Sequence, residues 1–202
     1  MKLEVPFYLQ TTKMNCGPIA LKMALEFLGE KYSIEEMEEI TGIKKGKSLS
    51  TIKLVIASKK LGFKTKFYSK HINFNPENLK LDFYKKYGIL NQSEISKALE
   101  EAKELGIELY EKTLTIPEII DNIQEDRVII ILLNWNIIKG TEGYQGHFVP
   151  VVGYDSENIY VHNHDFLNPT AFLPIKKELF EIARKSTGTD EDILVIYRKF
   201  EA

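Results

Sequence analysis

Hydrophobic positions in the first part of the chain recur with the spacing of helices. Apolar residues after Cys16 fall on one side of a helical repeat as far as Gly29, which predicts a helix with one buried face. They are Ile19, Ala20, Met23, Ala24, Phe27 and Leu28. Ser33-Ile34-Glu35-Glu36 is a capping-box start to a short helix that stops at Gly42, and a third helix is predicted over 50–61. The segment 3–10 is expected to be short and extended, because Pro6 disfavours a helix.

Farther along the chain the pattern changes from helices to strands. Helices are predicted over 76–87, 93–105 and 116–123, with short strands over 63–68 and 107–110. The last third is rich in strands, which we expect over 128–135, 148–154, 158–161, 171–173 and 193–197. Helices followed by an antiparallel sheet are the α+β pattern. No repeat or flexible linker divides the chain, so we expect a single α+β domain over residues 1–202.

Composition narrows the class of protein. The chain has 44% hydrophobic and 28% charged residues, which is ordinary for a soluble globular protein. Its formal net charge of −2 lacks the basic excess typical of nucleic-acid binding. The most apolar run, 128–133, is too short to cross a bilayer, and no secretory signal opens the sequence. We therefore expect a cytoplasmic protein with no membrane segment and no nucleic-acid partner.

The candidate chemistry begins at Cys16, the only cysteine, which excludes an internal disulfide and a thiolate metal cluster. A lone cysteine is most often a small buried hydrophobe. Cys16, however, stands at the predicted start of a helix, where free N–H groups and the helix dipole favour a thiolate. An oxyanion formed during attack on a carbonyl needs hydrogen-bond donors. The backbone N–H of Cys16 is one candidate donor, and the amide of Gln10, six positions upstream, is the other.

The residues around Cys16 resemble those of a known family. Val5-Pro6-Phe7-Tyr8-Leu9-Gln10 and the Cys16-Gly17-Pro18-Ile19-Ala20-Leu21 that follows are similar to the start of the bacteriocin-processing, double-glycine peptidases. That family is a branch of the papain-like cysteine peptidase clan. The resemblance implies that Cys16 is the nucleophile at the start of the central helix and that Gln10 lines the oxyanion hole.

A second motif supports the same resemblance. Gly146-His147-Phe148-Val149-Pro150-Val151-Val152-Gly153-Tyr154-Asp155 is similar to the family strand that begins with the catalytic His and turns at Gly-Tyr-Asp. The implied fold is papain-like, with an N-terminal helical half and a C-terminal antiparallel sheet that carries His147. Residues 70–113 have no counterpart in the resemblance and are expected to be a family-specific insertion.

Two residues are candidates for the third member of the catalytic triad. In the family, the return strand usually ends in Asn-Asp-Pro, and its Asp orients the His; by strand register, that position falls on Asn163, with His164 in place of Pro. An Asn orients an imidazole through its amide oxygen. Asp165, two residues on, shares the face of Asn163 if the strand continues. We favour Asn163 and keep Asp165 as the alternative.

Other residues invite weaker interpretations. His162 and His164 alternate along the predicted strand, but two His without a third ligand rarely hold a metal, so we expect no metal and no cofactor. Trp135 fits a cleft wall and core packing equally well.

The sequence thus predicts a cysteine peptidase that acts on a peptide or protein through an acyl-enzyme, with small residues such as Gly-Gly before the cleaved bond. Two alternatives stay open. The same triad serves an acyl or peptidyl transferase, and a similar cleft serves a peptide-binding module without turnover. The oligomeric state and the identity of the substrate are not specified by the sequence.

Overall fold

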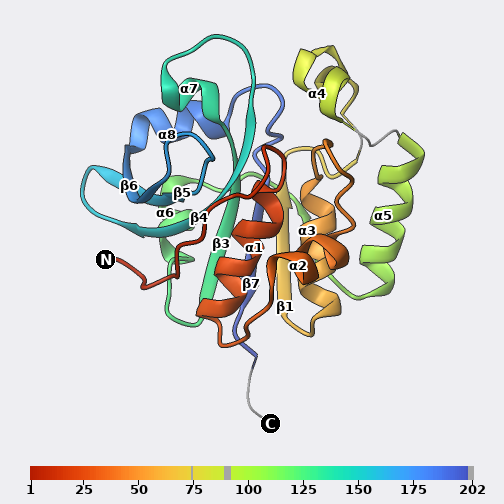
Figure 1. Ribbon diagram of the computed structural model, residues 1–202, viewed down its shortest axis with the longest axis horizontal. Helices are drawn as coiled ribbons and strands as arrows, with labels where there is room; N and C mark the ends of the chain where they lie inside the picture. Colours follow the sequence, from red (N-terminus) through yellow and green to blue (C-terminus); the bar gives the residue numbers. More distant parts are fainter. Residues whose placement is uncertain (74, 89–91, 200–202) are drawn as a thin grey trace.

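In the computed structural model, which describes residues 1–73, 75–88 and 92–199, seven strands form one sheet through the middle of the molecule (Figure 1). Their order is β2-β1-β7-β3-β4-β5-β6. Every neighbouring pair is antiparallel except β1 and β2, which run parallel. The strands are β1 (Lys64–Ser69), β2 (Glu108–Glu111), β3 (Arg127–Asn134), β4 (Gly146–Tyr154), β5 (Asn158–Asn163), β6 (Thr170–Lys176) and β7 (Ile193–Tyr197).

The α+β prediction is confirmed. The sheet also contains strands from before the last third of the chain. Strands β1 and β2 come from the middle of the sequence and extend the sheet beyond β7. A parallel pair needs a long crossover connection, and the chain between β1 and β2 supplies it with η1, α4 and α5. That connection is most of the segment 70–113, whose status as an insertion stays a prediction; residues 74 and 89–91 of it lie outside the described residues.

The predicted helices all occur, with one divided and two unforeseen. The helices are α1 (Cys16–Phe27), α2 (Ile34–Thr41), α3 (Thr51–Lys60), η1 (Pro76–Lys80), α4 (Asp82–Tyr87), α5 (Gln92–Glu104), α6 (Ile116–Asp121), α7 (Trp135–Lys139) and α8 (Lys177–Arg184). The capping box at Ser33 is formed as expected. The helix predicted over 76–87 is divided at Leu81, whose backbone is extended. Neither α7 nor α8 was predicted.

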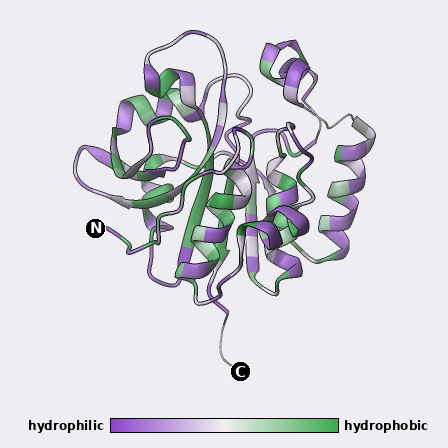
Figure 2. Cartoon of the chain, viewed as in Figure 1, coloured by the Kyte–Doolittle hydropathy of each residue, from purple (hydrophilic) through white to green (hydrophobic). Residues whose placement is uncertain are grey.

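Helices and loops cover both faces of the central strands. Every residue of β3 from Val128 to Asn134 is buried, which requires cover on both sides. Helix α1 packs on β3 and β4, α3 packs on β1 and β7, and α8 packs on β3 (Figure 1). Figure 2 shows the apolar residues gathered on these strands and on the inner side of α1, with polar residues on the outer helices. The core therefore holds the start of α1 against β4.

The Gly-Tyr-Asp motif has a structural role at the β4–β5 turn. Asp155 Oδ1 accepts hydrogen bonds from the backbone N–H groups of Glu157 and Asn158 at 2.8 and 2.7 Å, and the hydroxyl of Tyr160 donates to Oδ2 at 2.6 Å. Lys2 pairs with Gly153 as an isolated bridge, and the N–H of Leu3 donates to the carbonyl of Val152 at 2.7 Å. The first residues thus lie along β4, although 3–10 contains no assigned strand.

Aromatic side chains attach α4 to the rest of the fold. The hydroxyls of Tyr84 and Tyr144 both donate to the carbonyl of Gly188, at 2.6 and 2.7 Å, and their rings stack with centroids 5.4 Å apart. The backbone N–H of Ser48 donates to the carbonyl of Tyr87 at 2.9 Å. Gly188 is required at this point, because a Cβ there would lie 2.6 Å from Leu81 Cδ1 and 2.7 Å from Tyr144 Cε2.

Substitution of Gly188 by Ala should therefore destabilise the protein through a steric clash. Gly29→Ala is the matched control, because Gly29 has a similar positive φ of 107° against 101° for Gly188, with Arg198 as its nearest neighbour at 3.8 Å. Both variants carry the strain of Ala at positive φ, and only Gly188→Ala adds overpacking, which costs about 1–3 kcal/mol. Urea unfolding of the two variants measures the difference. Equal losses of unfolding free energy in the two variants would show that the side chains around Gly188 move aside without cost.

Candidate active site

A cavity of about 390 Å³ lies at the start of α1, between α1 and β4. Four residues named from the sequence line it: Gln10, Cys16, His147 and Asp165. Helix α4 and the segment around α7 lie at the same end of the molecule as the start of α1 (Figure 1). Their side chains complete the wall, so residues far apart in the sequence meet around one thiol.

Cys16 is the first residue of α1 and remains partly accessible from the cavity. Burial raises the pKa of the Cys16 thiol to about 11. The backbone N–H groups of Phe148, Gly17 and Cys16 itself act in the opposite direction, and the charge of Asp165 adds to the increase. The sequence analysis expected a thiolate at the helix start. In this structure the desolvation of the sulfur outweighs the N–H groups, and the thiol is neutral at neutral pH.

His147 lies near the start of β4 with 3% of its surface exposed. Its ring packs edge-on against Trp135, with centroids 4.8 Å apart, and beside His164 at 4.9 Å. Burial lowers the pKa of His147 well below its ordinary value, and the charge that His164 acquires on protonation lowers it further. Among the described residues, His147 Nε2 has no hydrogen-bond partner. The site therefore holds a neutral imidazole with one unoccupied nitrogen.

Asn163, at the end of β5, contacts the imidazole of His147. The polar side chain of Asn163 raises the pKa of His147, against the effect of burial. An amide oxygen directed at the ring would favour its protonated form in this way. The Asn163 amide is itself oriented, because its Nδ2 donates to the carbonyl of Asn168 at 2.6 Å and its Oδ1 accepts from the N–H of Asp165 at 3.2 Å.

Asp165 occupies a different place. Strand β5 ends at Asn163, so Asp165 does not continue the strand face as the alternative required. Its side chain lines the cavity, and its charge acts on the thiol of Cys16. Within the described residues, the imidazole of His147 meets Asn163 and not Asp165.

Gln10 lies in the wall of the cavity and is 6% exposed. Its backbone N–H donates to the carbonyl of His164 at 3.1 Å. Its side-chain Nε2 donates to the carbonyl of Thr12 at 3.1 Å, which leaves the amide one further hydrogen. The structure thus brings Gln10 to the same cavity as Cys16, with its amide turned partly toward its own loop.

His162 and His164 bond to the backbone. His162 Nε2 lies 2.8 Å from the carbonyl of Val5, and its Nδ1 accepts from the N–H of Phe172 at 3.1 Å. His164 Nε2 lies 2.9 Å from the carbonyl of Cys16, a contact that the sequence analysis missed. In the ranges that the structure describes, no group of three or more His, Cys, Asp or Glu side chains is arranged to hold a metal ion.

The sequence analysis also missed the aromatic wall of the cavity. Phe83, Tyr84 and Tyr87 of α4 line it, together with Tyr144 from the loop before β4. Their approach depends on long-range docking, for which the local sequence carries no spacing signal. Trp135, by contrast, is 2% exposed and packs against His147, so it supports the imidazole from the core side.

Comparison with known proteins gives two kinds of relative. A model of the guanylylate cyclase family matches residues 5–196. Guanylyl cyclase 1 of Arabidopsis thaliana is 25% identical over 210 residues, which covers 96% of this chain and 76% of the plant protein. Among the described residues, none of the helices combines the length and the apolar character needed to cross a membrane.

The similar solved structures are peptidase domains. A double-glycine motif protease from an AMS/PCAT transporter, solved with its leader peptide, has a TM-score of 0.54 at 17% identity, over 98% of this chain and 94% of that one. The peptidase domain of Streptococcus ComA, a bifunctional ABC transporter, gives 0.52 at 18%, over 97% and 100%. A C39-like peptidase from Bacillus anthracis gives 0.58 at 15%, over 100% of both chains. The shared fold is that of the double-glycine peptidase domains, as the sequence resemblance implied.

The neutral state of the cavity predicts how Cys16 reacts with pH. With its pKa at about 11, the thiolate fraction grows about tenfold for each pH unit below that value. The rate of iodoacetamide labelling should therefore rise steadily from pH 6 to pH 9, and mass spectrometry measures it on the single cysteine. A short unstructured peptide with one Cys, whose pKa is about 8.5 and whose rate therefore flattens near pH 9, is the control. A rate that is already high and constant from pH 6 would instead indicate a stable thiolate–imidazolium pair.

Proposed function

The chain belongs to the guanylylate cyclase family and has a peptidase fold, and on these premises we propose that it is a cysteine peptidase that uses Cys16, His147 and Asn163. The observation that carries the proposal is that Cys16 and His147 line one cavity, with the side chain of Asn163 beside the His147 ring. A nucleophile, a base and a group that orients the base are the parts that thiol acyl transfer requires. Gln10 is the fourth proposed participant.

In the first step, the sulfur of Cys16 attacks the carbonyl carbon of the scissile peptide. Because the thiol and the imidazole are both neutral, the unprotonated ring nitrogen of His147 accepts the thiol proton as the C–S bond forms, which is general-base catalysis. Asn163 accepts a hydrogen bond from the other ring nitrogen and stabilises the resulting imidazolium. The N–H of Cys16 and the amide of Gln10 donate to the developing oxyanion.

In the second step, the tetrahedral intermediate collapses. The C–N bond breaks, the leaving amine takes the proton from His147, and a thioester to Cys16 remains. Water, deprotonated by His147, then attacks the thioester and releases the acid with the free thiol. An amine in place of water gives acyl transfer through the same intermediate, so product analysis with an added amine separates the two reactions.

The mouth of the cavity suits an extended peptide with apolar side chains. Phe166 and Leu167 line it and are 56% and 75% exposed. The aromatic side chains of α4 form another part of the wall. Exposed apolar residues beside a cleft are typical of binding surfaces. Since one neighbour in fold was solved with a leader peptide, we propose a peptide substrate with small residues, such as Gly-Gly, before the cleaved bond.

Family membership favours a second candidate, guanylyl cyclase activity. The family model covers residues 5–196, and the plant relative bears that name. The reaction would convert GTP to cyclic GMP and pyrophosphate. It requires no thiol nucleophile, so the two candidates differ in their dependence on Cys16. Incubation of the wild type and of Cys16→Ala with GTP and either Mg²⁺ or Mn²⁺, with cyclic GMP measured by mass spectrometry, tests it.

The peptidase proposal is tested with a panel of peptides that carry Gly-Gly next to varied residues. We expect cleavage by the wild type and none by Cys16→Ala, with cleavage read by mass spectrometry and folding by circular dichroism. A Gly-Gly peptide aldehyde should form an adduct with Cys16 in the wild type alone. Production of cyclic GMP at equal rates by the wild type and Cys16→Ala, with no cleavage of any peptide by the wild type, would replace the peptidase with the cyclase.

The role of Gln10 predicts a rate effect without a binding effect. Gln10→Ala should lower kcat by roughly 10²-fold or more, because an oxyanion donor acts only as charge develops in the transition state. Gln10→Glu is the matched control, since it keeps the shape of the side chain but carries no N–H donor, and it should lose as much. A rise in KM with kcat unchanged would mean that Gln10 only shapes the pocket.

The choice of orienting residue is tested with three variants. Asn163→Ala should lower the rate of peptide cleavage more than Asp165→Ala, because only Asn163 meets the imidazole. Asn163→Asp should stay active, since a carboxylate accepts the same hydrogen bond. Greater damage from Asp165→Ala than from Asn163→Ala would assign the role to Asp165.

A further inference from the structure

A second cavity, of about 130 Å³, adjoins the candidate active site. Leu49, Tyr84 and Leu132 line both cavities, whereas Cys16 and His147 line only the first. Its walls come from the start of α3, from β1, from the segment that contains η1, and from the loop between α8 and β7. No step proposed above uses this second cavity.

Three polar atoms on its wall are buried without a partner. Ser50 Oγ, Asn78 Oδ1 and Asp192 Oδ1 have almost no accessible surface, and none has a hydrogen-bond partner among the described residues. An unsatisfied buried polar group costs about 1–3 kcal/mol, and native structures contain few of them. The three residues come from separate segments and line one cavity, so a single ligand that reached into its wall would satisfy all three atoms together.

The cavity is lined by two carboxyl groups, Asp190 and Asp192, and by the imidazole of His71, and none of its lining residues is a Lys or an Arg. The side-chain amides of Asn75 and Asn78 donate to the two carboxylate oxygens of Asp190, at 2.7 and 2.6 Å. Thr51 donates to Asp192 Oδ2. Within the described residues, no Lys, Arg or His forms an ion pair with either carboxylate. Burial raises the pKa of Asp192 to about 7, the hydroxyls of Thr51 and Ser69 act in the opposite direction, and the charge of Asp190 adds to the increase.

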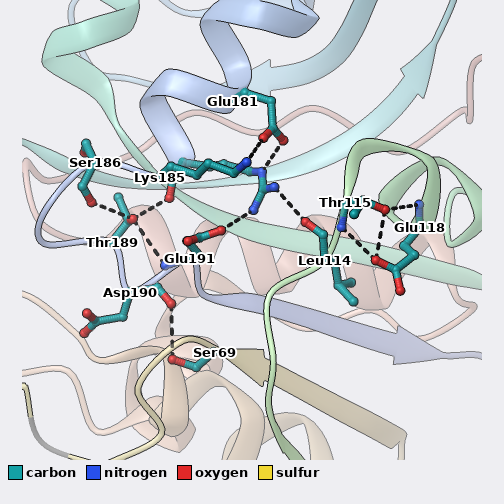
Figure 3. Close-up of polar contacts among 11 residues, drawn as sticks. Ser69, Leu114, Thr115, Glu118, Glu181, Lys185, Ser186, Thr189, Asp190 and Glu191 are labelled. Atoms are coloured by element: carbon teal, nitrogen blue, oxygen red, sulfur yellow. Dashed lines mark hydrogen bonds and ion pairs between the residues drawn. The ribbon is translucent and has the colours of Figure 1, made fainter.

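The loop that carries these carboxylates is fixed by a polar network. Arg184 is 1% exposed; it pairs with Glu191 at 2.8 Å and donates to the carbonyl of Leu114 at 2.6 Å. The network around Glu181, Thr189 and Glu191 appears in Figure 3, where Ser69 donates to the carbonyl of Asp190. Asp190 and Glu191 both have positive φ, 47° and 55°. Such strain persists where the surroundings hold it and is common at binding sites.

We propose that this cavity binds an ammonium or guanidinium group on a short apolar body. Two of the free atoms, Asp192 Oδ1 and Asn78 Oδ1, are acceptors, and the hydroxyl of Ser50 also accepts. A ligand with several N–H donors and a positive charge satisfies all three, and Ile52 and Phe67 in the cavity wall contact the apolar body. A carboxylate or phosphate ligand would meet acceptors and negative charge.

The probe is propylguanidine, with propylurea as the neutral isostere. Isothermal titration of the full chain should show saturable binding of propylguanidine and at least tenfold weaker binding of propylurea. Asp192→Asn keeps the shape of the side chain and should weaken propylguanidine at least tenfold. Asp121→Asn, at an exposed carboxylate on α6, is the matched control and should bind like the wild type.

Ser50→Ala keeps the proposal testable if Asp192→Asn fails to fold. It removes an unpartnered hydroxyl, so the variant should unfold at the same urea concentration as the wild type or a higher one, yet bind propylguanidine more weakly. Absence of saturable binding, equal affinity of Asp192→Asn, or equal affinity of propylurea would overturn the proposal. Tighter binding of guanosine than of propylguanidine would also overturn it, because a neutral N–H edge would then be preferred.

The guanidinium or ammonium group can belong to a free molecule or to an Arg or Lys side chain of a peptide. Protein whose Cys16 carries a Gly-Gly peptide aldehyde should bind propylguanidine with the same affinity as the free protein. This result is expected whether the natural ligand is a free molecule or a peptide side chain. If the source is a peptide, an aldehyde extended by Arg or Lys should block propylguanidine in the wild type but not in Asp192→Asn. Binding to Cys16→Ala separates this proposal from the peptidase, since it requires no catalysis.

Discussion

Three segments of the candidate active site are tied together by one buried side chain, His164. Its Nε2 lies 2.9 Å from the carbonyl of Cys16, and its own carbonyl accepts from the N–H of Gln10 at 3.1 Å. Burial lowers the pKa of His164 to about 4, so the ring is neutral and donates a single N–H. The segment before α1, the start of α1 and the end of β5 are thereby held at one point. The neighbouring Asn163 is placed against His147 by the same strand end.

Burial then decides the electrostatics of the site. A helix start and nearby N–H groups stabilise a thiolate, but they act here on a sulfur that has lost most of its hydration, and desolvation is the larger effect. The imidazole of His147 is desolvated as well. The resting pair is neutral, and in the proposed mechanism its charges form only when substrate arrives. Preorganised donors are most effective for such transient charge.

The fold and the family point to different chemistry, and the residues of the candidate site favour one of the two. Fold does not determine function, because a single architecture supports unrelated sites. The likeness to peptidase domains, at 15–18% identity, establishes the architecture. The family name indicates nucleotide chemistry. The thiol of Cys16 and the imidazole of His147 line one cavity, with Asn163 beside that ring, and this arrangement favours acyl chemistry. The carboxyl groups of the second cavity favour a cationic partner.

Much of this protein is determined by local sequence. The apolar spacing after Cys16 specifies α1, the capping box specifies the start of α2, and the apolar run of β3 specifies a buried strand, because each signal lies within a few turns or one strand. The spacing of Gln10 from Cys16 and the position of His147 at a strand start are likewise readable. These positions predict that Cys16, at a helix start, and His147, at a strand start, lie close together.

Tertiary structure decided the rest, because it depends on contacts between distant segments. The end of β5 determines that Asn163 meets the imidazole of His147, and no residue pattern marks where that strand stops. The docking of Tyr84 on Gly188, which is 104 positions away in the sequence, forms the aromatic wall. Burial, which no local spacing reports, sets the pKa of Cys16 and of His147. The cavity at Asp192 exists only where α3, η1 and the loop before β7 converge, and this convergence is a property of the packed fold alone.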